Sequence, residues 1–157
     1  WLMGRNPRRT LVRVLLLAVF GGLFFSLVLR PVWTDGVSME PTVPDRSLHF
    51  AHMLAYRFAP PSRGDIVVIG GNGRKLLYLK RILGLPGERI EFRDGQLLID
   101  GRPLEEPYLR DAGDWTMPPQ DIEAGTYFVA GDNRRVAIRR HMIGFVERNR
   151  ITGKLIL

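Results

Sequence analysis

The chain opens with one long apolar block. Residues 14–29 carry no charge, and with Leu11 and Val32 included the block reaches the roughly 20 residues that a helix needs to cross the hydrocarbon core of a bilayer. We therefore predict a transmembrane helix over residues 14–32. A cleavable signal peptide also has an apolar core behind a basic start, but no small-x-small cleavage site follows Leu29, which favours the anchor.

Beyond this block the hydrophobic pattern changes to short runs that are typical of strands. β-branched and aromatic segments alternate with turn signals, and Asp94-Gly95 is a strong hairpin signal. Strands are predicted at residues 65–69, 76–83, 89–93, 96–99, 126–130, 143–146 and 151–157. The sequence thus predicts a mainly β domain of antiparallel sheets over residues 33–157, with no convincing soluble helix.

Three segments fit this pattern less clearly. The glycines of residues 70–73 predict a turn, since a phosphate-binding loop would need a helix pattern after it. The proline-rich residues 104–121 predict an ordered excursion over the surface. Residues 47–58 are apolar without clean periodicity and predict a core strand running into a hairpin. Alternatively, side chains of this hairpin dip into a membrane interface; they are Phe50, Met53, Leu54, Tyr56 and Phe58.

Composition limits the class of protein. The 157 residues, 45% of them hydrophobic, fit one domain with one core plus the apolar helix. Cysteine is absent, which excludes disulfides, a thiolate nucleophile and cysteine-ligated metals. The net charge is +7, but the basic residues are dispersed and are not interleaved with aromatic ones, so we expect no nucleic-acid partner.

The distribution of arginine around the apolar block predicts a topology. Four arginines precede the block and only Arg30 follows it directly, which places residues 1–13 in the cytoplasm and the rest of the chain outside. The four are Arg5, Arg8, Arg9 and Arg13. Basic residues beside a span attract acidic headgroups, so a lipid bilayer is an expected partner. Trp33 falls where an interfacial aromatic side chain would anchor the far end.

The first candidate for chemistry is Ser38, in the segment Gly-Val-Ser-Met-Glu-Pro-Thr of residues 36–42. Pro41 and Pro44 keep this backbone out of regular helix, so Ser38 is expected at a strand end or turn with an exposed Oγ. Most serines beside such turns only bond the backbone. Ser38 therefore needs an activating group.

Lys80 is the candidate activator. On a strand it shares a face with Tyr78 and Ile82, and an ammonium on a mostly apolar face is costly. Desolvation would lower its pKa and allow the neutral amine to accept a proton from a serine. The alternative is that Lys80 extends to solvent or meets a carboxylate. Arg81 takes the opposite face and is assigned no catalytic role.

Other side chains support catalysis less well. A histidine base would come from His49, His52 or His141, none of which lies in a motif. Glu105 and Glu106 are expected on an exposed loop in contact with solvent. Scattered His, Asp and Glu give a metal site little support, and we expect neither a metal nor a cofactor.

Four motifs in order resemble those of type I signal peptidases, the membrane-anchored Ser-Lys proteases that remove signal peptides from exported proteins. They are Gly-Val-Ser-Met-Glu-Pro-Thr at 36–42, Arg-Gly-Asp-Ile-Val at 63–67, Tyr-Leu-Lys-Arg-Ile-Leu-Gly-Leu-Pro-Gly-Glu at 78–88 and Gly-Asp-Asn-Arg at 131–134. The resemblance covers most of the chain from residue 33 to 154. It implies that Ser38 is the nucleophile and Lys80 the general base.

Further expectations follow from this resemblance. The backbone N–H of Ser38, with the Gly36 region, would stabilise the oxyanion. A preprotein signal peptide would bind as an extended strand against Val32, Val37, Leu77 and Tyr78. The site would be supported by Met39, Pro41, Asp132, Asn133 and Arg134. The implied location is the bacterial inner membrane, with the catalytic domain on its outer face; the sequence predicts no oligomeric state.

The last motif departs from the family. Ala137 stands where a serine would orient the lysine amine, and Arg139 and His141 replace an acid-base ion pair. Two alternatives therefore remain open at this stage. One is a relative with a narrow substrate range, such as a pilus-maturation peptidase, and the other is a membrane-tethered scaffold with weak or no catalysis.

Overall fold

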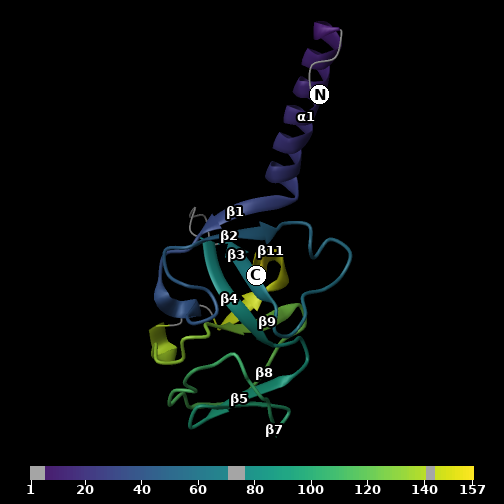
Figure 1. Ribbon diagram of the computed structural model, residues 1–157. Helices are drawn as coiled ribbons and strands as arrows, with labels where there is room; N and C mark the ends of the chain where they lie inside the picture. Colours follow the sequence, from purple (N-terminus) through teal and green to yellow (C-terminus); the bar gives the residue numbers. More distant parts are fainter. Residues whose placement is uncertain (1–5, 71–76, 141–143) are drawn as a thin grey trace.

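A computed structural model describes residues 6–70, 77–140 and 144–157, and it shows a single helix projecting from a β body (Figure 1). The helix, α1, spans Pro7–Leu27, and none of its residues is buried. Its length and apolar composition suit a membrane span. It begins earlier and ends sooner than the predicted 14–32, with proline in its first turn, a position that proline favours.

The predicted end of the helix is wrong because the chain forms a strand there. β1, Leu29–Trp33, pairs antiparallel with β2, Leu48–His52. Pro31 disfavours helix at the residue before it, and it is tolerated here because β1 is an edge strand. Val32 packs with Ala51 and other buried apolar side chains. The β domain therefore starts at Leu29 and not at residue 33.

The larger sheet has the strand order β1-β2-β11-β3-β4-β9-β10, and all its pairings are antiparallel. Its remaining strands are β3 Ile66–Gly70, β4 Leu77–Gly84, β9 Thr126–Ala130, β10 Phe145–Glu147 and β11 Ile151–Ile156. Each lies close to a predicted strand, which confirms the mainly β fold. The predicted turn at 71–73 lies outside the described residues.

A smaller sheet has the order β7-β6-β5-β8 and lies at the end of the molecule opposite α1 (Figure 1). Its strands are β5 Arg89–Arg93, β6 Gln96–Ile99, β7 Arg102–Pro103 and β8 Met117–Asp121. The predicted Asp94-Gly95 hairpin is confirmed, and both residues have positive φ. β8 corrects the interpretation of 104–121 as a loop only, since its prolines are tolerated at the sheet edge.

Two further segments complete the described chain. The strand predicted within 47–58 is β2, but it pairs with β1 and β11, so the segment forms no hairpin of its own. Residues 53–59 are turns and bends. Apart from α1, the helices of the described chain are three 3-10 turns: η1 Val37–Met39, η2 Ile138–Arg140 and η3 Arg148–Arg150. η1 carries Ser38.

Candidate active site

The turn that presents Ser38 is anchored by buried side chains. Met39 and Val43 pack with Ile66 and Leu155 beneath the turn. Gly36 precedes η1 with φ 126°, a conformation that favours glycine. Ser38 therefore lies on a well-packed base, in the turn that was predicted from its flanking prolines.

Hydrogen bonds hold the same turn from two sides. The Gly36 N–H donates to Asp45 Oδ1 at 2.7 Å. On the other side, Asn133 Nδ2 donates to the Val37 carbonyl at 3.0 Å and the Asn133 N–H to the Ser38 carbonyl at 3.1 Å. These bonds restrict the backbone around the hydroxyl, so that Ser38 is preorganised.

Lys80 reaches Ser38 from β4. Its Nζ donates to Ser38 Oγ at 2.7 Å, and the residue is only 7% exposed. Burial lowers the pKa of Lys80 to about 8, although the negative charge of Asp132 partly opposes this. The alternative that Lys80 extends to solvent is wrong. An amine with this pKa is neutral in a useful fraction of molecules near neutral pH.

The described part of the chain offers Lys80 Nζ no second hydrogen-bond acceptor. Ala137 and Arg139, the departures from the family motif, are both exposed. His141 lies outside the described residues. The hydrogen bond to Ser38 and the burial of the stem therefore position the amine in the described structure.

The N–H of Ser38 is available to a substrate. Within residues 6–70, 77–140 and 144–157 it donates to no protein acceptor. Such an N–H beside a candidate nucleophile suits the charge that develops on a carbonyl oxygen during acyl transfer. The geometry is therefore compatible with the oxyanion role expected for Ser38 and the Gly36 region.

A groove of about 420 Å³ runs past Ser38 and Lys80. Its walls come from β1 with the residues after it and from the start of β4. The groove is lined by Arg30, Pro31, Val32, Trp33, Thr34, Asp35, Gly36, Ser38, Met39, Val43, Leu77, Tyr78, Leu79 and Lys80. Val32, Leu77 and Tyr78 thus lie where substrate was expected. Val37 does not line the groove, and its side chain is 47% exposed.

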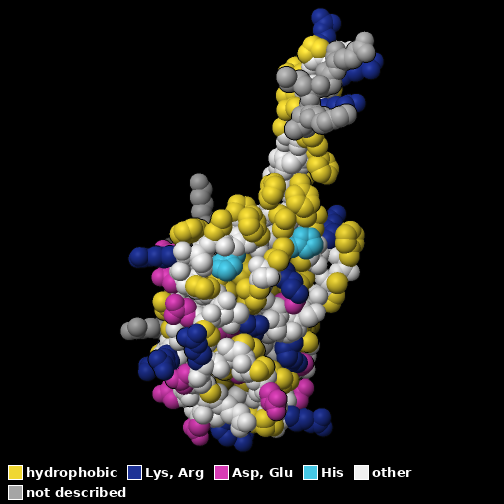
Figure 2. Space-filling model, in the orientation of Figure 1, with side chains coloured by type: hydrophobic (Ala, Val, Ile, Leu, Met, Phe, Trp, Pro, Cys, Tyr) yellow, Lys and Arg dark blue, Asp and Glu magenta, His cyan; other side chains and the backbone are white. Residues whose placement is uncertain are grey.

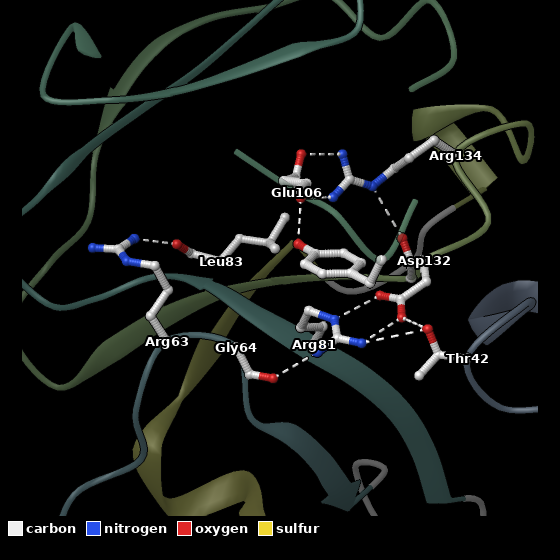
Figure 3. Close-up of polar contacts among 10 residues, drawn as sticks. Thr42, Arg63, Gly64, Arg81, Leu83, Glu106, Asp132 and Arg134 are labelled. Atoms are coloured by element: carbon white, nitrogen blue, oxygen red, sulfur yellow. Dashed lines mark hydrogen bonds and ion pairs between the residues drawn. The ribbon is translucent and has the colours of Figure 1, made fainter. Parts of the chain in front are cut away.

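The opposite face of β4 carries a second buried cation. Arg81 is 8% exposed and donates to both carboxylate oxygens of Asp132, at 2.9 and 2.6 Å (Figure 3). Asp132 also accepts from Thr42 Oγ1 at 2.5 Å. Burial acts to lower the pKa of Arg81, but the bonds and charge of Asp132 outweigh it and raise the pKa. This cluster joins β4 to two other segments: the one after Ser38, through Thr42, and the one before Asn133, through Asp132.

The cluster continues through Tyr108 to a second ion pair. The Arg81 guanidinium lies 3.9 Å from the centroid of the Tyr108 ring, and the Tyr108 hydroxyl donates to Glu106 at 2.5 Å. Glu106 pairs with Arg134, whose side chain is fully buried (Figure 3). The interpretation of Glu106 as a solvent-exposed carboxylate is therefore wrong, because its own ion pair buries it.

The predicted supporting residues differ in what they do. Met39 packs under the turn, Asn133 bonds it, and Asp132 and Arg134 form the ion pairs. Pro41 lines a separate cavity of about 470 Å³ beside the turn. Sequence reasoning missed Asp45, Thr42, Arg81 and Tyr108. A pattern cannot show which loop residue will lie beside another.

The remaining candidates do not join the site. His49 Nε2 lies 2.8 Å from Ser47 Oγ, and His52 pairs in β2 with β1 and β11. The described residues contain no group of three or more His, Cys, Asp and Glu side chains that could hold a metal ion. The arrangement that remains is a serine hydroxyl, a buried amine and a groove.

The model of the signal peptidase family, peptidase S26, matches residues 8–157. The chain is 31% identical over 156 residues to signal peptidase I of Bacillus licheniformis, covering 90% of this chain and 83% of that protein. It is 34% identical over 152 residues to signal peptidase I S of Bacillus subtilis strain 168, covering 89% and 82%. A crystal structure of a signal peptidase I from Enterococcus faecalis V583 is 29% identical, with a TM-score of 0.46, covering 61% of this chain and 97% of that one. The family match spans nearly the whole chain, and this protein belongs to the signal peptidase family, peptidase S26.

Proposed function

We propose that Ser38 and Lys80 form the catalytic dyad of a membrane-anchored serine protease that removes signal peptides from exported proteins. Membership of the S26 family makes the protein a serine protease of this class. The observation that carries the residue assignment is the 2.7 Å contact between a buried lysine amine and the serine hydroxyl. A membrane-tethered scaffold would have no need of this contact.

The mechanism is acyl transfer. With the amine neutral, the Ser38 hydroxyl donates its proton to Lys80 Nζ as Oγ attacks the carbonyl carbon of the cleaved bond. The Ser38 N–H stabilises the resulting oxyanion. Lys80 then protonates the leaving amine, and water attacks the acyl-enzyme to release the signal peptide and restore the serine.

The groove supplies the binding site for an extended segment. β1 is an edge strand, so its free backbone groups can pair with a substrate strand. Val32, Leu77 and Tyr78 line apolar parts of the groove beside Ser38. Shallow apolar walls favour small side chains before the cleaved bond, in line with the small residues expected in a signal-peptide cleavage site.

We place α1 across a bacterial inner membrane, with the residues before it in the cytoplasm and the β domain on the outer face. The arginines at the start of the chain support this orientation. Hydrophobic side chains also gather where α1 joins the β body (Figure 2). Phe58 is 96% exposed, Leu54 44% and Phe50 40%, which supports an interfacial role for these three side chains. Met53 and Tyr56, the other two residues predicted there, pack against the core instead. Holding enzyme and substrate at one surface raises their effective concentration.

The test compares cleavage of a preprotein by the full-length chain in detergent with that by Ser38→Ala and Lys80→Met. We expect each variant to lose at least about 10³-fold in kcat/KM, since residues that act as a unit fail together. Wild-type kcat/KM should rise as pH passes about 8, where the Lys80 amine loses its proton. Lys154→Met, at a lysine paired with Asp65, is the matched control and keeps the activity.

Appreciable cleavage by either dyad variant would contradict the assignment of these residues. Circular dichroism and reconstitution into vesicles show whether the variants fold and insert. A well-folded wild type that cleaves no preprotein from a broad set would contradict signal-peptide removal itself.

A further inference from the structure

The groove beside Ser38 carries opposite charges at its two ends. Arg30 lies on β1 at the end that adjoins α1, and Asp35 lies just before Gly36 at the end next to the nucleophile. Both residues are exposed. In the part of the chain that the structure describes, neither side chain forms an ion pair or a hydrogen bond.

These two charges contrast with the others around the site. Arg81 is held by Asp132, and Arg134 by Glu106, so their charges are satisfied within the protein. The charges of Arg30 and Asp35 are met only by water until a substrate occupies the groove. A bound segment would displace part of this water and strengthen any pairing with the two groups.

Topology sets which part of a substrate meets each charge. The apolar segment of a signal peptide precedes its cleavage site and lies in the membrane. With the cleaved bond at Ser38, the residues before it extend along β1 toward α1. At ~3.3 Å per residue, the stretch from Arg30 to Gly36 matches about five to seven residues of extended substrate.

We propose that these two charged ends make the groove selective for the charge pattern of its substrate. Arg30 favours a carboxylate, and disfavours a cation, about five to seven residues before the cleaved bond. Asp35 favours a cation closer to that bond. This specificity rests on the proposed function. It adds to the preference for small residues that the walls of the groove impose.

The expected effect is moderate, because both groups are partly solvated. A single exposed ion pair is a weak interaction, so exchanging attraction for repulsion should change kcat/KM by about 3- to 10-fold. Added salt should weaken the preference, since it screens exposed charges.

The experiment uses peptides that keep one small-x-small cleavage site and carry Glu, Gln or Lys at each position from about seven to four residues before the cut, or at the middle position of the site. The full-length wild type, Arg30→Glu and Asp35→Lys are assayed in neutral-detergent micelles, which contain no lipid phosphate. The readout is the ratio of kcat/KM for Glu over Lys peptides within each enzyme, which cancels any general loss of activity. Arg102→Glu, on β7 of the smaller sheet, is a control with the same change of charge.

We expect wild type to prefer Glu over Lys by about threefold or more at the distant positions, and Arg30→Glu to invert that ratio. Asp35→Lys should alter the ratio only near the cleaved bond, and Arg102→Glu should match wild type. Equal ratios in wild type and Arg30→Glu would overturn the proposal, as would an equal shift in Arg102→Glu. No cleavage of any peptide by wild type would instead contradict the proposed function and this inference with it.

Discussion

Lys80 and Arg81 are neighbours on β4, and both are buried cations, yet their surroundings give them opposite properties. Lys80 faces a serine hydroxyl, and burial lowers its pKa to about 8. Arg81 faces Asp132, whose bonds keep the guanidinium charged despite its burial. Burial alone thus favours a neutral base, whereas burial with a hydrogen-bonded carboxylate gives a fixed ion pair.

The two faces of β4 serve one site from different sides. In the proposed mechanism the face with Lys80 provides the proton acceptor, and the face with Arg81 fixes Asp132. Asn133 follows Asp132 directly and bonds the turn of Ser38. The ion pair can therefore position the nucleophile without touching it.

The largest effect is expected from replacing Lys80 with a cation like that of Arg81. Lys80→Arg leaves a group that stays protonated in proteins, so it cannot accept the Ser38 proton. We expect kcat to fall by about 10²–10⁴-fold, the usual contribution of a general base. Single-turnover cleavage measures this loss. Activity within a few-fold of wild type would show that proton acceptance by Lys80 is not required.

The second prediction removes the partner of Arg81. Asp132→Ala leaves a buried guanidinium without its carboxylate, which should destabilise the protein by about 3–5 kcal/mol. Urea denaturation in detergent measures the change in the free energy of unfolding. Asp111→Ala, at a carboxylate in an exposed pair with Arg135, is the control and should cost far less, because solvent screens an exposed pair. Similar costs for the two variants would contradict a structural role for the buried pair.

The third prediction concerns pH and stability. The pKa of Lys80 is near 8 when folded and near 10.5 when unfolded, so the unfolded chain binds more protons between these values. The contribution of Lys80 to the free energy of unfolding of the wild type should therefore rise as pH increases from about 8 to 10.5. Below pH 8 the burial costs roughly 3–4 kcal/mol, which Lys80→Met should recover while abolishing cleavage.

Denaturation of wild type and Lys80→Met at matched pH values tests this prediction. The two stabilities should converge only above about pH 11, where the lysine is largely neutral in both folded and unfolded chains. A variant less stable than wild type at pH 7 would mean that the buried amine is a net stabilising group.

The smallest effect is expected from a change at Asn133, which connects the Arg81–Asp132 pair to the turn that carries Ser38. Asn133→Ala removes the bond to the Val37 carbonyl but keeps the backbone bond to Ser38. A typical hydrogen bond contributes about 1 kcal/mol, so we expect a loss of about fivefold in kcat with little change in KM. Steady-state kinetics separates the two constants. A change confined to KM would assign Asn133 to substrate binding.

The fold was largely predictable because strands and turns leave local signals. The hairpin at Asp94-Gly95 and strand β9 are found as predicted. The end of the apolar helix was not predicted correctly. Leu29 and Val32 are apolar and were included in the helix, but Pro31 and the pairing with β2 make this segment a strand. Strand β8 was missed because prolines mask an edge strand.

The candidate site, like the fold, could be predicted from the sequence only in part. The motifs singled out Ser38 and Lys80, and the structure brings these two side chains into contact. Arg81, however, was assigned no role, and Glu106 was predicted to be exposed to solvent. Pairing with Asp132 and Arg134 depends on which loops meet in space, and no local pattern records that. The buried ion pairs therefore had to come from the structure.

The pKa of Lys80 tests most directly whether burial prepares this lysine as a base. The chain has only three lysines, Lys75, Lys80 and Lys154, so NMR titration of the lysine side chains in micelles can resolve each one. The Lys80→Met variant assigns the signal. A midpoint near 8 for Lys80 is the expected result. A midpoint near 10.5 would contradict the role of Lys80 as a neutral general base.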